Sequence, residues 1–298
     1  MAVPNYLQAE LVNDARSVLG EGPVWEAKTG FLYWVDIEGC RLHRHHPESD
    51  TNKSWDFDGM ISAIIPEVGG SLLVAHEKGM MRFYPESGKQ VSLPLLVNSD
   101  PRLRFNDGKC DPLGSIFIGT MDKELVPHAG QLYRISAQAR VQILIPGTSV
   151  SNGMAWTSDR RYFYYIDSPT FEVWRFDYDA DTGDIAIKTV AFRIPKKYGS
   201  ADGMTIDAEG MLWIAHWGGH AVRRWDPDTG TVLATVHVDA PHVTCCCFGG
   251  RKMDTLYITT ARSGLDPETL DAYPASGGLF KCQPGKTGFA PNYFNANA

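Results

Sequence analysis

Four acidic or amide residues, each followed directly by glycine, are the part of this 298-residue chain best suited to chemistry. They are found in the dipeptides Glu21-Gly22, Asp107-Gly108, Asn152-Gly153 and Asp202-Gly203. A hydrophobic segment of strand character follows each one, with its middle 8 to 10 residues after the glycine. A lone Asp-Gly or Asn-Gly is usually only a turn. Four such dipeptides at equivalent distances from a strand, in which the glycine is constant and the preceding residue varies, favour a functional site.

Three carboxylates and an amide in one place would favour a bound divalent cation. Carboxylates that converge without a cation repel one another, and their pKa values rise. The set offers only oxygen ligands, which suits a hard or borderline ion. We therefore predict one divalent metal ion. The ligand chemistry favours Ca²⁺, Mg²⁺ or Mn²⁺ and leaves Zn²⁺ and Fe²⁺ open.

The elements that must position these residues recur six times along the chain. Equivalent strand positions are occupied by Leu32, Leu72, Ile116, Phe163, Leu212 and Leu256, at intervals of 40, 44, 47, 49 and 44 residues. The intervening segments alternate apolar and polar residues and end on Pro, Asp or Gly, a pattern typical of strands joined by tight turns. A repeat of about 45 residues without helices is typical of a propeller blade. We predict an all-β fold, a six-bladed β-propeller, with residues 1–298 forming a single domain.

In such a ring, equivalent positions of the repeats face the central axis. Glu21, Asp107 with its neighbour Asn106, Asn152 and Asp202 should therefore face one channel. The second and sixth repeats carry Ser62 and Thr244 in this register instead. Segments 6–12 and 288–294 should help to close the ring by pairing with strands from the other end of the chain, because closure removes an exposed sheet edge.

Composition limits the partners and the compartment. The net charge is −7 and no stripe of Lys and Arg is present, so we do not expect nucleic acid or an anionic membrane as a partner. No apolar run approaches the length of a membrane span. The first residues lack a basic segment followed by an apolar one, and the cysteines lack metal-binding or redox spacing. We expect a cytoplasmic protein. Its oligomeric state is left open, and a monomer is compatible with the sequence.

Five motifs resemble those of the senescence marker protein 30/gluconolactonase/regucalcin-like family of six-bladed propellers, and the likeness extends over nearly the whole chain. They are Leu19-Gly-Glu-Gly-Pro-Val-Trp25, Arg104-Phe-Asn-Asp-Gly-Lys109, Gly119-Thr-Met121, Ser151-Asn-Gly-Met154 and Asp202-Gly-Met204. Within this family the chain is most similar to the bacterial sugar lactonases of pentose oxidation. That finer likeness rests on segments 213–219, 259–270 and 273–280.

The resemblance implies a metal held by Glu21, Asn152 and Asp202, and substrate contacts from Arg104, Asn106 and Glu124. We predict metal-dependent hydrolysis of a sugar 1,4- or 1,5-lactone (xylono-, arabinono-, glucono- or galactonolactone) to the aldonic acid. Asp202, beside the open face of the metal, is the predicted general base. Arg104 and Asn106 would orient the sugar hydroxyls.

Two other classes of function stay open. One is a different metal-dependent hydrolysis on the same scaffold, such as phosphotriester cleavage, because a fold does not determine the chemistry. The other is a propeller without enzymatic activity that binds calcium or a protein. His216, Trp217 and His220 follow the fifth-repeat strand and are candidates for lining the channel, without an assigned role. The sequence lacks a Gly-x-Ser-x-Gly elbow and a dinucleotide fingerprint, so neither a serine hydrolase nor a nucleotide-binding protein is predicted.

Overall fold

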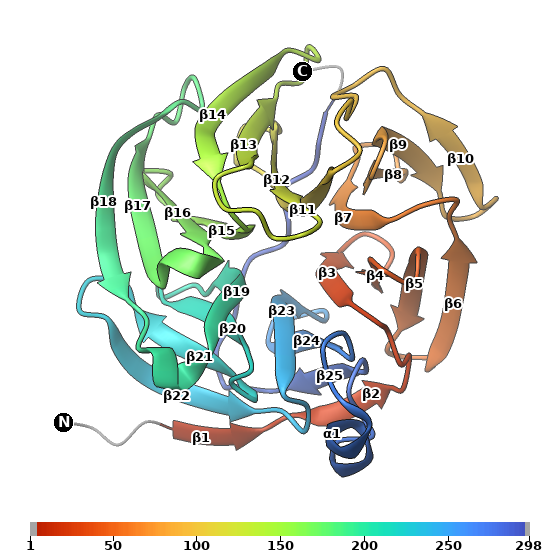
Figure 1. The fold of residues 1–298 in the computed structure, drawn as a ribbon, viewed down its shortest axis with the longest axis vertical. Coiled ribbons are helices and arrows are strands. Elements are labelled where there is room, and N and C mark those ends of the chain that lie inside the picture. The colour runs from red at the N-terminus through yellow and green to blue at the C-terminus, as the bar shows by residue number, and fades with distance from the viewer. Residues whose placement is uncertain (1–4, 296–298) are drawn as a thin grey trace.

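The computed structural model describes residues 5–295 and arranges their strands as a ring around a central channel (Figure 1). Within this part of the chain, the strands form four separate four-stranded sheets and one nine-stranded sheet. In each separate sheet, the first strand lies at the channel and the last lies at the rim (Figure 1). The prediction of an all-β propeller is confirmed.

Each separate sheet is an antiparallel meander of four consecutive strands. The strands are β3 (Gly20–Glu26), β4 (Phe31–Asp36), β5 (Arg41–His46) and β6 (Thr51–Asp56) in the first sheet, β7 (Ile61–Pro66), β8 (Leu72–His76), β9 (Gly79–Tyr84) and β10 (Lys89–Ser92) in the second, β11 (Leu103–Cys110), β12 (Ile116–Asp122), β13 (Gly130–Ile135) and β14 (Val141–Thr148) in the third, and β15 (Ser151–Trp156), β16 (Tyr162–Asp167), β17 (Glu172–Tyr178) and β18 (Ile185–Arg193) in the fourth.

The nine-stranded sheet contains the fifth and sixth repeats. Its strands are β1 (Asn5–Gln8), β2 (Glu10–Asn13), β19 (Ser200–Ile206), β20 (Leu212–Trp217), β21 (Ala221–Asp226), β22 (Thr231–His237), β23 (His242–Gly249), β24 (Thr255–Ala261) and β25 (Leu279–Cys282). Strands β20 and β23 meet at one residue pair, Trp217 opposite His242. The two rings stack with their centroids 3.9 Å apart, which draws the strand ends together. The prediction of six blades is therefore wrong: one continuous sheet replaces the separate fifth and sixth blades.

The N-terminal segment closes the ring by pairing with strands near the other end of the chain, as predicted, whereas the same prediction for segment 288–294 is wrong. β2 pairs antiparallel with β25, and β1 pairs parallel with β22. Segment 288–294 forms no blade strand among the described residues. It makes single bridges from Gly288 to Asp207 and from Phe294 to Glu67, and so runs from the nine-stranded sheet to the second sheet. In Figure 1 this segment crosses the ring close to its centre.

Aromatic and aliphatic side chains fill the spaces between neighbouring sheets. Between the third and fourth sheets, the ring of Phe117 lies edge-on to Trp156 and Phe163, with centroid distances of 5.1 and 5.3 Å. Such buried side chains stabilise the fold because they remove apolar surface from water. The described helical elements are η1 (Ser168–Thr170), η2 (Lys196–Tyr198) and α1 (Pro267–Ala272), none of them long and apolar enough to cross a membrane.

Candidate active site

The innermost strands share a local irregularity at the register of the polar-glycine dipeptides. The pairing with the next strand shifts between Glu21 and Val24, between Asn152 and Met154, and between Ala201 and Met204. Strands β7, β11 and β23 shift at the corresponding points. A bulge releases residues from the ladder and redirects their side chains.

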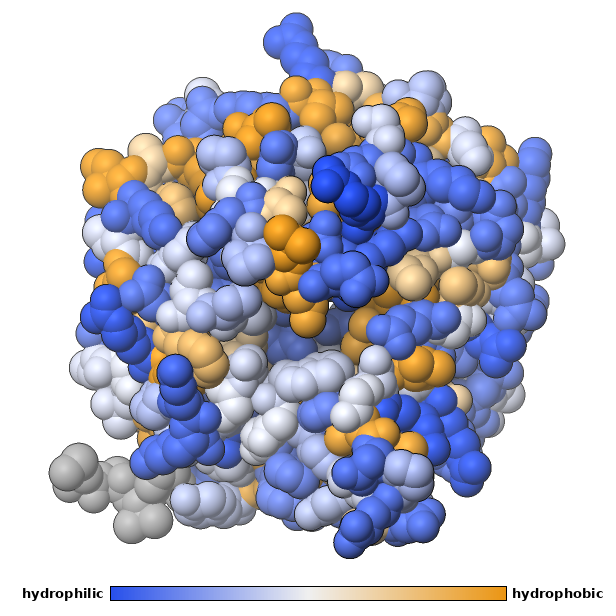
Figure 2. All heavy atoms as spheres, in the orientation of Figure 1, coloured by the Kyte–Doolittle hydropathy of each residue, from blue (hydrophilic) through white to orange (hydrophobic). Residues whose placement is uncertain are grey.

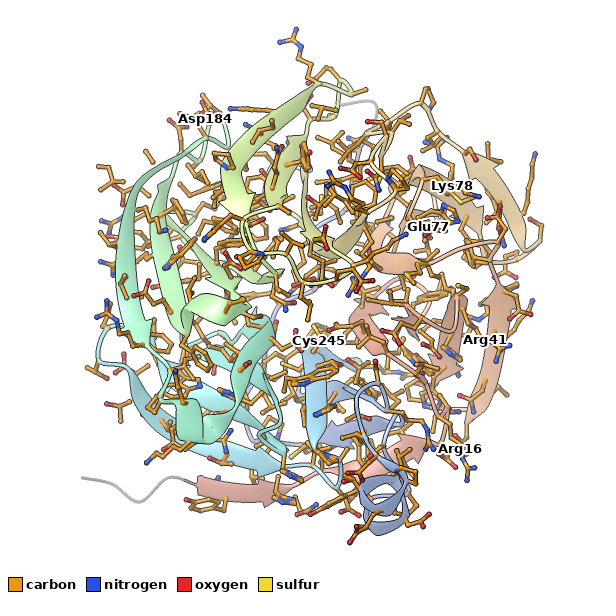
Figure 3. All side chains as sticks on the ribbon, viewed as in Figure 1. Arg16, Arg41, Glu77, Lys78, Asp184 and Cys245 are labelled. Carbon is orange, nitrogen blue, oxygen red and sulfur yellow. The ribbon has the colours of Figure 1, made fainter. Side chains whose placement is uncertain are left out.

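The glycines of these bulges allow neighbouring strands to approach closely. A Cβ atom on Gly153 would lie 2.8 Å from the carbonyl oxygen of Asp202. A Cβ atom on Gly203 would lie 2.2 Å from Sγ of Cys245, which Figure 3 shows on β23 beside the centre of the ring. Real Cβ contacts are not this short, so the crowding requires glycine at both positions. The face in Figure 2 is hollowed at the same centre.

A chain of hydrogen bonds links three innermost strands at this point. Nδ2 of Asn106 donates to the carbonyl oxygen of Ser151 at 2.9 Å and to Oδ1 of Asn152 at 3.3 Å. Nδ2 of Asn152 donates to Oγ of Ser168 at 2.9 Å, and that hydroxyl donates to the carbonyl oxygen of Ala201 at 2.6 Å. Since the amide nitrogen of Asn152 is occupied, its oxygen is the atom that faces Asn106 and remains available as a ligand.

Arg104 joins the same network. Its Nη1 donates to Oδ1 of Asn106 at 2.6 Å and to the carbonyl oxygen of Phe105 at 3.0 Å. Burial lowers the pKa of the Arg104 guanidinium, and the negative charges of Glu21, Glu38 and Asp202 oppose that shift. The structure thus brings Arg104 and Asn106 together with Asn152 and the two predicted carboxylate ligands.

Burial and mutual repulsion perturb the three carboxyl groups. Burial, followed by the negative charge of Asp107, raises the pKa of Glu21 to about 8. Burial and the charges of Glu21 and Asp107 raise the pKa of Asp202 well above its usual value. Burial also raises the pKa of Asp107, although Lys109 opposes this. Glu21, Asp107 and Asp202 therefore share one poorly solvated volume.

This cluster suits a cation. Oδ2 of Asp107 is buried and has no hydrogen-bond partner within residues 5–295. A positive charge would also remove the repulsion between the carboxylates. No group of three or more His, Cys, Asp and Glu side chains in the described chain is arranged as a metal site. The predicted set differs from such a group because it combines two carboxylates with the amide oxygen of Asn152, an arrangement of oxygen donors that hard cations accept.

The other candidates form no hydrogen bond with this cluster among the described residues. Glu124 is exposed in the loop between β12 and β13, and its side chain forms no hydrogen bond or ion pair with the network in the part of the chain described. His216 is fully buried against Trp225, whose Nε1 donates to its Nε2 at 3.4 Å. His220 packs against the rings of His237 and Tyr273. Trp217 stacks on His242, so one face of its indole is covered.

The sequence reasoning missed two groups that link the site strands. Ser168 connects Asn152 to Ala201, as described above, but a lone serine after a strand gives no signal in the repeat pattern. Lys109 donates from Nζ to the carbonyl oxygen of Met154 at 3.1 Å and to that of Met204. The available signal was its place at the end of the motif Arg104-Phe-Asn-Asp-Gly-Lys109, two residues after Asp107.

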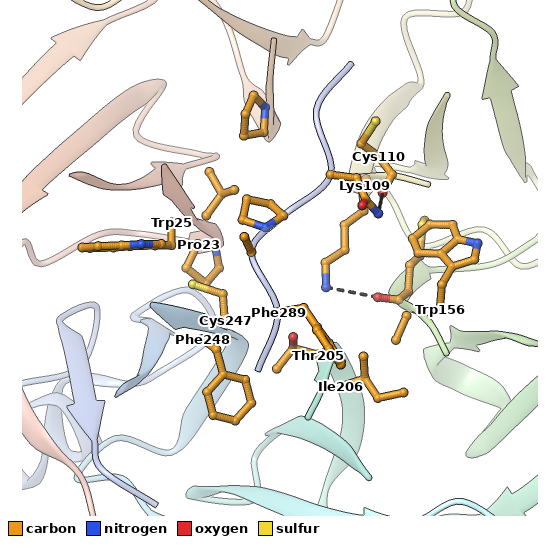
Figure 4. A pocket seen from close by; sticks show the side chains of 18 of the residues that line it. Pro23, Trp25, Lys109, Cys110, Trp156, Thr205, Ile206, Cys247, Phe248 and Phe289 are labelled. Atoms are coloured by element: carbon orange, nitrogen blue, oxygen red, sulfur yellow. Dashed lines mark hydrogen bonds between the residues drawn. The ribbon is translucent and has the colours of Figure 1, made fainter. Parts of the chain in front are cut away.

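A cavity of about 420 Å³, drawn in Figure 4, borders the carboxyl cluster at Asp107. The ends of the innermost strands line it, and residues 289–292 of the C-terminal segment cover it. The walls are largely aromatic and aliphatic, with Trp25, Trp156, Ile206 and Phe289 among them. The longer dashed line in Figure 4 marks the hydrogen bond from Nζ of Lys109 to the carbonyl oxygen of Met154.

The chain is similar to curated proteins over nearly its full length. It is 37% identical over 285 residues to "Putative sugar lactone lactonase YvrE" of Bacillus subtilis, covering 96% of this chain and 98% of that protein. It is 38% identical over 279 residues to human regucalcin, covering 91% and 93%.

A solved structure has the same fold. A calcium-binding protein, regucalcin from Agrobacterium tumefaciens, superposes with a TM-score of 0.93 at 28% identity and covers 99% of both chains. Residues 19–262 match the family described as "SMP-30/Gluconolactonase/LRE-like region". This span includes every innermost strand from β3 to β23 and therefore the whole bulge register of the site. The chain belongs to the SMP-30/gluconolactonase/LRE-like family.

Proposed function

We propose that this protein hydrolyses a sugar lactone to the open-chain aldonic acid with the help of one divalent cation. The observation that carries the proposal is the meeting of two kinds of group at one end of the channel. Glu21, Asn152 and Asp202 provide oxygen ligands, and Arg104 is hydrogen-bonded to Asn106 directly beside them. The relative named as a sugar lactone lactonase supports this substrate class.

Glu21, Asn152 and Asp202 would hold the cation. When bound, a divalent cation acts as a Lewis acid on the lactone carbonyl and stabilises negative charge on its oxygen. The carboxylate of Asp202 would take a proton from the attacking water. The water oxygen bonds to the carbonyl carbon, the ring C–O bond breaks, and the departing ring oxygen takes a proton. The product is an aldonate, and one proton is released.

Arg104 and Asn106 would bind the substrate. Arg104 is half-buried and presents further N–H donors beyond the two bonds that it makes within the protein. Such donors pair with sugar hydroxyls and orient the ester. A site built for hydroxyls discriminates against a ring that lacks them, because its buried polar groups would stay unpaired.

The proposal is tested by pH-stat assay of xylono-, arabinono-, glucono- and galactonolactone beside an unsubstituted γ- and δ-lactone. The protein is used after chelation and again after addition of Ca²⁺, Mn²⁺, Mg²⁺, Zn²⁺ or Fe²⁺. We expect activity on the sugar lactones, its loss with chelator and its return with one of the metals. Equal or faster turnover of the unsubstituted rings would contradict the sugar specificity.

A calcium-binding protein without catalytic activity is the second candidate. The Agrobacterium regucalcin, described as a calcium-binding protein, favours it. The same assay separates the two candidates. A protein that binds Ca²⁺ with a defined stoichiometry but hydrolyses none of the lactones under any metal condition would favour calcium binding alone.

A further inference from the structure

The two bulges that carry Asn152 and Asp202 belong to different sheets. β15 begins the fourth sheet and β19 pairs only with β20 in the nine-stranded sheet, so no backbone ladder among the described strands fixes the distance between them. The bulges nevertheless pack tightly, as the approach of Gly153 to the Asp202 carbonyl shows. Side-chain links between the sheets must therefore set the relative position of the two predicted ligands.

One link lies on the side of the bulges where the strands begin. Asn152 reaches the carbonyl oxygen of Ala201 through the hydroxyl of Ser168. Ala201 directly precedes Asp202, so this link attaches to the residue at which the second bulge starts.

A second link lies on the other side. Nζ of Lys109 donates to the carbonyl oxygens of Met154 and Met204. These are the residues at which regular pairing resumes after the bulges of β15 and β19. A single ammonium group on β11 thus joins the ends of both bulges, and Figure 4 shows Lys109 among the side chains that line the cavity.

We propose that Lys109 is a positioning residue of the metal site, which sets the separation of Asn152 and Asp202 by holding the ends of their bulges together. This inference rests on the proposed function, because it concerns the same metal. Removing the ammonium would take the side-chain donor away from the carbonyl oxygens of two fully buried residues, Met154 and Met204, and would let the two strands separate. Supporting groups of this kind commonly change metal affinity by about 10- to 100-fold.

Lys109→Met is the main test, because it keeps a long side chain and removes the donors. We expect the protein to fold and to bind the divalent metal about tenfold or more weakly by isothermal titration calorimetry. Lys109→Arg, which keeps donors and charge, should recover part of that affinity. Lys286→Met is the matched control. Nζ of Lys286 lies 2.6 Å from Oε1 of Glu209, and this ion pair involves no residue of the proposed metal site. Loss of the Lys286 ammonium should therefore leave metal affinity unchanged.

A double-mutant cycle separates positioning from general stability. If Lys109 acts by placing Asn152, then Lys109→Met should weaken metal binding much less in an Asn152→Ala background than in the wild type. A Lys109→Met protein that binds metal like the wild type, or a fully additive cycle, overturns the inference. If Lys109→Met does not fold, Lys109→Gln, which is uncharged and shorter, takes its place, and wild-type metal affinity or a fully additive cycle in that variant overturns the inference equally. Wild-type protein that neither binds metal nor hydrolyses lactones refutes the proposed function itself.

Discussion

Nδ2 of Asn106 lies 3.3 Å from Oδ1 of Asn152, across the boundary between the third and fourth sheets. This contact joins a predicted substrate residue to a predicted metal ligand. Because Arg104 donates to the oxygen of Asn106 and Ser168 accepts from the nitrogen of Asn152, both amide groups have a defined orientation. The proposed metal and substrate sites therefore form one network, and a change at Asn106 should affect both.

Asp202→Asn should separate the two roles proposed for Asp202. The amide keeps an oxygen ligand but cannot accept the proton of the attacking water. We expect kcat to fall by about 10²- to 10⁴-fold, the usual contribution of a general base, with a smaller loss of metal affinity. Asp202→Ala should weaken both together, as should Glu21→Ala and Asn152→Ala.

The measurements are lactone hydrolysis at saturating metal and calorimetric titration of the metal. Asp271→Asn, at an exposed carboxylate of α1, is the control and should behave as the wild type. Normal metal binding and normal turnover in Asp202→Ala would show that the site is elsewhere.

Arg104→Ala should impair substrate binding and leave metal binding intact. Arg104 contacts Asn106 but not a predicted ligand, so its loss should raise KM, lower kcat, or both, with about a 10²-fold loss of kcat/KM from misplaced substrate. Metal content measured by atomic absorption should not change. Asn106→Ala is the informative comparison, because it also removes the donor to Asn152 and should weaken metal binding. Loss of metal in Arg104→Ala would assign Arg104 a structural role.

The repeat pattern predicted the strands and the register of the site, because both depend on local alternation and on glycine. It did not predict that the fifth and sixth repeats share one sheet. That feature depends on the stacking of Trp217 and His242, which are 25 positions apart in the sequence and give no periodic signal. Glu124 shows the same limit. It was assigned from the family resemblance, and the direction of an exposed side chain is not encoded in the spacing of the repeats.

Phe294→Ala should destabilise the whole ring. Phe294 is 2% exposed and packs in the core around β7 and β11, and its backbone bonds to Pro66 and Val68. Truncating a buried Phe to Ala usually costs about 3–5 kcal/mol, because it leaves a cavity as well as losing apolar contact. We expect a clear fall in Tm and in the free energy of unfolding in urea.

Phe289→Ala is the matched control for that experiment. Phe289 lies on the same segment but is 46% exposed, so its substitution should cost much less. Equal effects of the two substitutions would mean that the C-terminal segment does not stabilise the ring through Phe294.

The raised pKa of Glu21 predicts opposite pH dependences for the stability and the metal affinity of the protein. The pKa of Glu21 rises from 4.5 to about 8 on folding. Between these two pH values, the metal-free folded state therefore holds a proton that the unfolded state has lost. The stabilisation is complete below about pH 4.5 and is lost as the pH rises through about 8. The raised pKa values of Asp107 and Asp202 act in the same direction.

Metal binding requires the charged form of these carboxylates. Binding should therefore release protons, and the metal affinity should increase as the pH rises toward 8. Thermal unfolding from pH 5 to 9, without and with metal, measures both trends, and titration in buffers of different ionisation enthalpy counts the protons. Glu21→Gln, which is neutral at every pH, should flatten the fall in metal-free stability and release fewer protons when metal binds. A metal-free Tm that stays constant across this range in the wild type, together with metal binding that releases no protons, would show that these carboxyl groups are already ionised in the folded protein.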